Sequence, residues 1–138
     1  MGINQVLIEW QHYNEVKKQF NFVIGRSKKD NQIHGILGFI PNSHFDKKIK
    51  QIDLALALWK VREDVKAGGL GISLIRFLEV DLKPRSVYGI GINPIVLPIY
   101  KYMGFKIGSM SHYYIVNTKK KNFNLISNFD GIYFNEKL

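Results

Sequence analysis

Along the first forty positions, the hydrophobic residues first recur every three or four residues and then every second residue. The residues at the wider, helical spacing are Trp10, Tyr13, Val16 and Phe20. They predict a short amphipathic helix or turn. Residues 22–25 and 33–40 then read as strands, a polar turn at residues 27–31 joins them, and Pro41 ends the second. This part of the chain therefore predicts an antiparallel hairpin.

A third apolar stretch covers residues 52–61, after a polar and basic loop at residues 42–51. Its leucines alternate with alanine and tryptophan, so that both sets of positions are apolar. The residues concerned are Leu54, Leu56 and Leu58 in one set and Ala55, Ala57 and Trp59 in the other. Such a pattern predicts a strand that is buried on both faces.

The middle of the chain has the order strand, glycine loop, helix, strand. Three glycines lie in residues 66–71, and Ile72, Ile75 and Leu78 then recur at helical spacing. Residues 87–92 read as a fourth strand. Because a helix separates the third strand from the fourth, we expect these two strands to be parallel.

Residues 93–104 predict a second short helix. Asn93 has the character of an N-cap, Pro94 suits the first helical position, and Gly104 suits the left-handed residue after a helix. Pro98 would interrupt a helix that began at Pro94, so we expect a kink or a start nearer Pro98. After this helix we expect a closing strand pair at residues 105–110 and 113–116, a basic turn at 118–121 and one more strand within 122–134.

Length and composition exclude several classes of protein. The chain has 138 residues, of which 46% are hydrophobic and 22% charged, and this predicts one folded domain. We divide it into an abbreviated front at residues 1–21, a core at 22–117 and a C-terminal extension at 118–138. The absence of cysteine excludes disulfides and thiol catalysis. No apolar stretch approaches the roughly 20 residues of a spanning helix, and no secretory signal is present, so we expect no membrane span and a cytoplasmic location.

The glycine loop is the first candidate for chemistry. The first amides of a helix have no partners within it and lie at the positive end of its dipole, so they can bind an anion such as phosphate. Glycines allow a phosphate to approach the backbone closely, and Lys66 adds a positive charge. The spacing matches neither common nucleotide fingerprint. A tight turn without a ligand explains the same glycines.

Two motifs together resemble the GNAT superfamily of acyl-CoA N-acyltransferases. That family's loop reads Arg or Gln, two residues, Gly, one residue, then Gly or Ala, and Lys66, Gly69 and Gly71 occupy these positions. Lys66 is a conservative departure. The family's later motif is matched by Asn93, by Tyr100 seven residues on, and by the pair at residues 104–105. The resemblance covers about two thirds of the chain, between residues 22 and 116.

The resemblance implies an α+β fold with three layers. Its sheet is mixed, twisted and mostly antiparallel, with helices on both faces, and its central parallel pair splays apart around acetyl-CoA or another acyl-CoA. The diphosphate would lie on the loop amides, and the pantetheine arm would pair with the edge near Leu58 and Val61. The expected cofactor-binding residues are Leu58, Val61, Lys66, Ala67, Gly68, Gly69, Leu70, Gly71, Ile72, Asn93 and Tyr100.

The resemblance also implies direct attack of an amine on the thioester. Tyr100 would then be the general acid that protonates the departing thiolate. No single carboxylate is indicated as the base; Asp53 is our first candidate, and proton loss through water is an alternative. The other candidates are Glu63, His34 and His112. The four histidines lack the spacing of metal ligands, so we expect no metal.

The acceptor and the partners are less defined. Trp10 and Tyr13 before the hairpin resemble GNAT-like proteins that acylate amino sugars, so we expect a small amine acceptor. Because the front is short, a homodimer is one way to complete the acceptor site. The excess of 20 Lys+Arg over 11 Asp+Glu is dispersed over several loops, which disfavours nucleic acid. The alternative function is a non-catalytic binding module that uses this basic surface.

Overall fold

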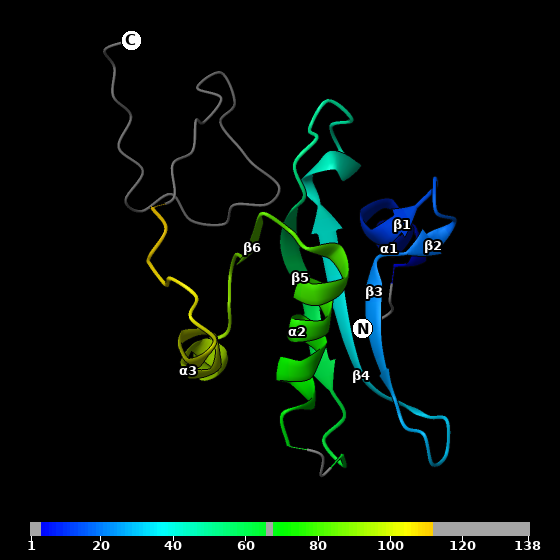
Figure 1. The fold of residues 1–138 in the computed structure, drawn as a ribbon, viewed down its shortest axis with the longest axis vertical. Coiled ribbons are helices and arrows are strands. Elements are labelled where there is room, and N and C mark those ends of the chain that lie inside the picture. The colour runs from blue at the N-terminus through cyan, green and yellow to red at the C-terminus, as the bar shows by residue number, and fades with distance from the viewer. Residues whose placement is uncertain (1–3, 66–67, 112–138) are drawn as a thin grey trace, which may run out of the picture. The chain divides into compact units, whose positions relative to one another are not determined.

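Four strands form one sheet in the order β3-β4-β5-β6 (Figure 1). The computed structural model describes residues 4–65 and 68–111. Within it, β3 (Phe22–Arg26), β4 (Ile33–Pro41) and β5 (Asp53–Val61) pair antiparallel in turn, and β6 (Ser86–Gly89) pairs parallel with β5. The predicted hairpin and the predicted parallel pair are both confirmed. Contacts divide the chain into a unit at Met1–Ile107, which contains this sheet, and a second unit at Gly108–Leu138.

The segment before the sheet contains the predicted short helix, but this helix ends before the later residues of the predicted stripe. Helix α1 covers Gln5–His12 and is capped by the side chain of Asn4, which accepts a hydrogen bond from the Leu7 amide. A two-stranded sheet follows, formed by β1 (Tyr13–Asn14) and β2 (Gln19–Phe20). The helix ends early because Asn14 accepts hydrogen bonds from the next amides, those of residues 16 and 17, and so stabilises a turn.

Helix α2 (Leu70–Leu82) contacts β3, β4 and β5, and Figure 1 shows its axis running roughly along the direction of these strands. It begins two residues before the predicted start, because Gly69 adopts a left-handed φ of 81° and serves as the N-cap. The predicted inward stripe is confirmed for Ile75 and Leu78, which are fully buried. Gly25 and Gly35 of the sheet lie directly beneath Leu70 and Leu74, which lets the helix pack closely.

Strand β5 is buried on both faces only in its first half, so the prediction for residues 52–61 is wrong in part. Leu54 is fully buried, whereas Leu58 is 44% exposed. The register places Phe39 opposite Leu56 and Gly38 opposite Leu58, so that Ala57 is an extra residue that bulges from the strand. Pairing with β6 stops just before this bulge. Within the described residues, the second half of β5 therefore pairs with β4 alone.

Two short helical segments follow β6, which is shorter than the predicted strand at residues 87–92. The 3-10 helix η2 covers Pro94–Val96 and α3 covers Leu97–Tyr102. The expected start near Pro98 and the left-handed Gly104, with a φ of 88°, are both confirmed. Residues 105–111 form no helix or strand, so the strand predicted at 105–110 is wrong. The strand predicted at 113–116, the turn predicted at 118–121 and the strand predicted within 122–134 lie outside the described residues. The predicted loop before β5 contains η1 (Asn42–His44).

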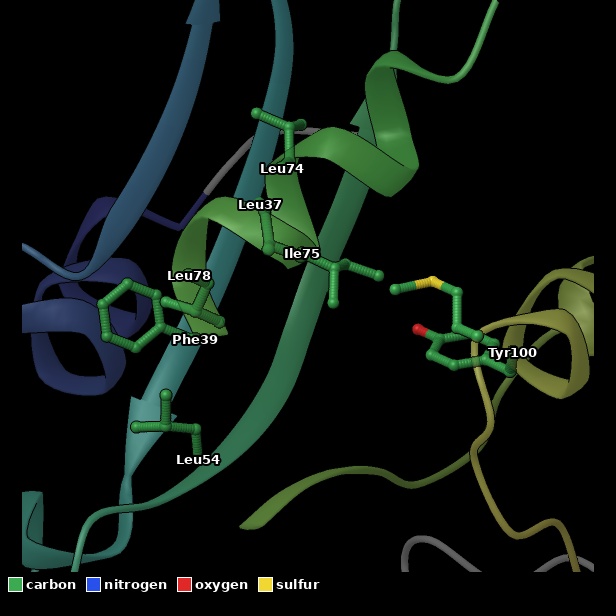
Figure 2. Packing of buried hydrophobic residues seen from close by; sticks show 8 residues of the cluster. Leu37, Phe39, Leu54, Leu74, Ile75, Leu78 and Tyr100 are labelled. Carbon is green, nitrogen blue, oxygen red and sulfur yellow. The ribbon is translucent and has the colours of Figure 1, made fainter. Parts of the chain in front are cut away.

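Helices lie on both faces of the sheet, as expected. A Cβ on Gly35 would point at Leu70 and Leu74 of α2, whereas a Cβ on Gly38 would meet His12 at the end of α1. These two positions of β4 face opposite sides, so α2 and the end of α1 lie on opposite faces. The core is shown in Figure 2. It consists of Leu37, Phe39, Leu54, Leu74, Ile75, Leu78, Tyr100 and Met103.

Candidate functional site

The site is defined by the point where β5 and β6 separate. The two strands pair only from Asp53 with Ser86 to Leu56 with Gly89. Beyond the bulge at Ala57, the edge of β5 that faces away from β4 pairs with no strand among the described residues. Its backbone donors and acceptors are therefore available to a ligand that lies along the edge. The predicted contacts Leu58 and Val61 both lie on this stretch.

The glycine loop opens directly onto the same region. Among residues 4–65 and 68–111, nothing lies within 4 Å of a Cβ built on Gly68 or on Gly69, so these residues leave open space beside this backbone. The α2 helix starts immediately afterwards, with Leu70, Gly71 and Ile72 as its first residues. Ser73 turns its hydroxyl back and donates it to the Gly69 carbonyl at 3.1 Å. The other two predicted loop residues, Lys66 and Ala67, lie outside the described residues.

A pocket of about 340 Å³ joins the loop to the free edge of β5. Its lining comes from β5, from the start of α2 and from the segment around α3. The lining residues are Trp59, Val61, Gly69, Leu70, Gly71, Ile72, Val96 and Ile99. Five of them, Val61 and the four residues at 69–72, are predicted cofactor contacts. The structure therefore brings the two halves of the predicted cofactor site together.

Tyr100 packs beside this pocket and contacts one of its walls. Its ring meets that of Trp59 edge to face at a centroid distance of 5.5 Å, and that of Phe105 in the same manner at 5.1 Å. Figure 2 shows the Tyr100 ring extending from α3 toward Ile75 of α2, with its hydroxyl on that side. Burial raises the pKa of Tyr100 above its ordinary value. The phenol thus stays protonated at neutral pH.

Asn93 lies at the turn into η2, where its side chain accepts a hydrogen bond from the Ile95 amide at 3.0 Å. This is the N-cap arrangement that its position before Pro94 predicts. A contact between Asn93 and a cofactor stays a prediction.

Asp53 is held in an ion pair that does not suit a base. It is buried at the start of β5, where the guanidinium of Arg85 donates to both of its carboxylate oxygens and Ser86 donates its hydroxyl at 2.6 Å. The hydrogen bonds from Arg85, followed by that from Ser86, lower the pKa of Asp53. Since its oxygens already accept these protons, we assign Asp53 to joining β5 and β6 and do not propose it as the base.

The other base candidates are dispersed. Glu63 lies in the exposed turn after β5. His34 is on β4, with its Nε2 3.9 Å from a carboxylate oxygen of Asp30. His112 lies outside the described residues. The structure brings none of the described candidates into the pocket at the glycine loop.

Two further residues are placed by the structure. Trp59, which the sequence offers with Trp10 and Tyr13 either as the lining of an acceptor cleft or as core packing, lines the pocket at the glycine loop and contacts Tyr100. His12 is buried against Phe22, and its Nδ1 lies 3.3 Å from the Phe39 carbonyl. Desolvation lowers the pKa of His12, so the ring is neutral at pH 7. The spacing of residues in the sequence does not single out His12.

The arrangement of strands and helices is the fold of the GNAT acetyltransferases. A candidate acetyltransferase from Deinococcus radiodurans superposes with a TM-score of 0.51 at 20% identity, over 67% of this chain and 59% of that one. A candidate acetyl transferase from Pyrococcus furiosus gives a TM-score of 0.53 at 13% identity, over 69% and 64%. The glucosamine-6-phosphate N-acetyltransferase of Arabidopsis thaliana gives 0.52 at 12% identity, over 70% and 68%.

These likenesses concern the fold. The aligned part of the chain spans about three fifths of the Deinococcus radiodurans protein. No family model matches the sequence, and a search of curated proteins finds no match. In residues 4–65 and 68–111, no helix has the length and apolar character needed to cross a membrane, and no three side chains of the metal-binding types cluster.

Proposed function

We propose that the chain is an acyl-CoA-dependent N-acyltransferase that uses acetyl-CoA or a similar thioester. One observation carries the proposal: the open backbone at the start of α2 and the unpaired edge of β5 border a single pocket. An extended ligand with an anionic end fits this combination. Phosphates would be held by the first amides of α2, and an arm with amide groups would pair with the strand edge.

The residues present fit the phosphate end of such a ligand. A phosphate that approaches Gly68 and Gly69 meets no side chain of the described residues within 4 Å of their Cβ positions. Leu70, Gly71 and Ile72 supply amides that have no partner within the helix. On the side of the arm, Leu58 and Val61 follow the bulge at Ala57, where the strand edge becomes free.

The reaction follows from holding an amine beside the thioester. The amine nitrogen attacks the carbonyl carbon, a C–N bond forms, and the C–S bond breaks. Tyr100 gives its hydroxyl proton to the departing thiolate and is reprotonated from solvent, while water removes the proton from the amine. Holding the reactants in place supplies much of the rate, for which oriented systems give about 7–11 kcal/mol. Burial keeps the pKa of Tyr100 above its ordinary value, so the phenol carries its proton at neutral pH.

The acceptor that we propose is a small amine, with an amino sugar as the first choice. The superposed Arabidopsis thaliana protein is a glucosamine-6-phosphate N-acetyltransferase, and its likeness extends over 70% of this chain. Glucosamine 6-phosphate and glucosamine are therefore the first acceptors to test, followed by a panel of simple primary amines.

The test combines binding and turnover. Calorimetry with acetyl-CoA should give saturable heat, and release of free thiol in the presence of an acceptor should report transfer. Tyr100→Phe should lower turnover by about 10²-fold or more while leaving the acetyl-CoA affinity nearly unchanged. An equal loss in affinity and turnover would show that Tyr100 acts through packing. Binding without transfer to any acceptor would favour the non-catalytic module instead.

A further inference from the structure

Strand β6 is held to the sheet over a short distance only. It pairs with β5 from Ser86 to Gly89, and no strand lies on its other side among the described residues. After Gly89 the chain leaves the sheet and continues through η2 into α3, which carries Tyr100. The position of Tyr100 relative to β5 therefore depends in part on how firmly the start of β6 is held.

Asp53 joins the start of β6 to the start of β5. Its carboxylate accepts two hydrogen bonds from the guanidinium of Arg85, the residue just before β6, and one from the Ser86 hydroxyl at 2.6 Å. The Arg85 amide also donates to the Ile52 carbonyl at 2.8 Å. We call Ile52, Asp53, Arg85 and Ser86 the Asp53 cluster.

The Asp53 cluster differs from an ordinary surface ion pair. Asp53 is 5% exposed, so its carboxylate depends on Arg85 and Ser86 for hydrogen bonds that bulk water cannot supply. Bonds to a charged oxygen are shorter and stronger than bonds between neutral groups. Removing one partner would leave a buried charge without compensation. The cluster is therefore a firm point of attachment for β6.

The expected ligand and Tyr100 belong to different sides of the pocket. The glycine loop and the free edge of β5 come from β5 and α2, whereas Val96, Ile99 and the neighbouring Tyr100 come from the segment that follows β6. Asp53 and Val61 lie at opposite ends of β5, and at about 3.3 Å per residue these ends are about 25 Å apart. A small rotation of β6 at the Asp53 cluster would thus displace α3 against the β5 edge.

We infer that Asp53, acting through Arg85 and Ser86, is a positioning residue for the transfer reaction, because the Asp53 cluster sets the distance between Tyr100 and a thioester on the β5 edge. The inference rests on the proposed function, in which Tyr100 protonates the departing thiolate. A misplacement of about 1 Å in such a site can lower turnover by about 10²-fold. A weakened cluster lowers turnover, whereas acetyl-CoA, which is held by the glycine loop and the β5 edge, still binds.

The kinetic test uses Asp53→Asn, which keeps the size of the side chain and removes its charge. Turnover should fall about 10- to 100-fold, while the calorimetric affinity for acetyl-CoA should change little. Arg85→Lys keeps a positive charge beside the carboxylate and should retain more turnover than Arg85→Gln. The matched control is Arg76→Gln, because Arg76 also donates to a carboxylate, that of Glu79, on the exposed side of α2. This control should behave like the wild type.

A second measurement needs no substrate. The Trp59 and Tyr100 rings are in contact at 5.5 Å, so the indole N–H resonance of Trp59 in the ¹⁵N-labelled chain reports the place of α3 relative to β5. The chain has two tryptophans, and Trp10→Phe assigns their signals. Asp53→Asn should move or broaden the Trp59 resonance, and Arg76→Gln should leave it in place.

The outcomes separate the inference from the proposed function. Unchanged turnover in a folded Asp53→Asn variant overturns the inference. Equal losses of turnover and acetyl-CoA affinity overturn it too, since they indicate a general loss of structure, as does a fall in turnover with an unmoved Trp59 resonance. Absence of acetyl transfer by the wild type rejects the proposed function, and the role of Asp53 in the reaction with it. If Asp53→Asn fails to fold, Arg85→Lys against Arg85→Gln decides, because the Arg85 side chain is 64% exposed.

Discussion

Alanine at three neighbouring glycines should have three different effects. At Gly68 a Cβ meets no described residue within 4 Å, so Gly68→Ala should leave stability unchanged or raise it by about 0.4–1 kcal/mol through the unfolded state. At Gly69 the φ of 81° is left-handed, which costs an L-residue about 1–2 kcal/mol. At Gly71 the new Cβ would lie 2.8 Å from Cζ2 of Trp59, which is fixed on its far side by Tyr100.

The Gly71→Ala change has two opposing contributions. Forcing a methyl group against a packed ring costs about 1–3 kcal/mol. Replacing glycine by alanine in a helix returns about 1 kcal/mol, so the net loss should be about 0–2 kcal/mol. The displaced indole should also weaken acetyl-CoA binding, which Gly68→Ala should leave intact.

Urea unfolding measures the stability of the three variants, and calorimetric titration measures their affinity for acetyl-CoA. Gly68→Ala should be the most stable of the three and should bind acetyl-CoA like the wild type. Gly71→Ala should lose more affinity for acetyl-CoA than its loss of stability would suggest, because the added methyl group contacts Trp59, which forms a wall of the pocket. If Gly71→Ala matched Gly68→Ala in both stability and affinity, Trp59 would not be packed against the start of α2, and the geometry described here would be refuted.

Three further predictions concern the scaffold. The lowered pKa of Asp53 contributes stability that is fully present above pH 3.8, near the pKa of the unfolded chain, and is lost as the pH falls through the pKa of the folded chain. Asp53→Asn should therefore make the free energy of unfolding depend less on pH in this acid range. An unchanged pH dependence there would contradict the ion pair. The lowered pKa of His12, a residue that also faces His44, contributes stability that is present above about pH 6.5 and lost below it; His12→Asn, which keeps a donor toward the Phe39 carbonyl, should reduce this dependence in thermal melts at pH 5 and 7.5. Leu37→Ala should cost about 2–5 kcal/mol in urea unfolding because Leu37 is fully buried, and a loss as small as that of exposed Val6→Ala would contradict the core.

The order of the elements from β3 to α3 could be predicted because local signals agree with one another there. Alternation marks the strands, Pro41 ends β4, and a helix between two strands requires that they run parallel. The two motifs then placed the glycine loop and Tyr100 near each other, and the pocket at the loop with Trp59 between them is consistent with that placement.

The remainder depends on contacts that the sequence does not display. Asn14 ends α1 through side-chain hydrogen bonds, and its competition with a helix could not be weighed from spacing alone. The exposure of Leu58 follows from the bulge at Ala57, which depends on the register with β4. The pairing of Asp53 with Arg85 joins residues 32 positions apart, so an ion pair could not be distinguished from a base in advance.

The binding of a diphosphate at the start of α2 is the central feature of the proposed function. Calorimetric titration of acetyl-CoA into Gly68→Glu, with Gly68→Gln as the matched neutral control, tests this directly because a Cβ at position 68 meets no described residue within 4 Å. We predict that the glutamine variant binds nearly as well as the wild type, whereas the glutamate variant binds far more weakly through charge repulsion. Equal affinity of the two variants would contradict phosphate binding at this loop.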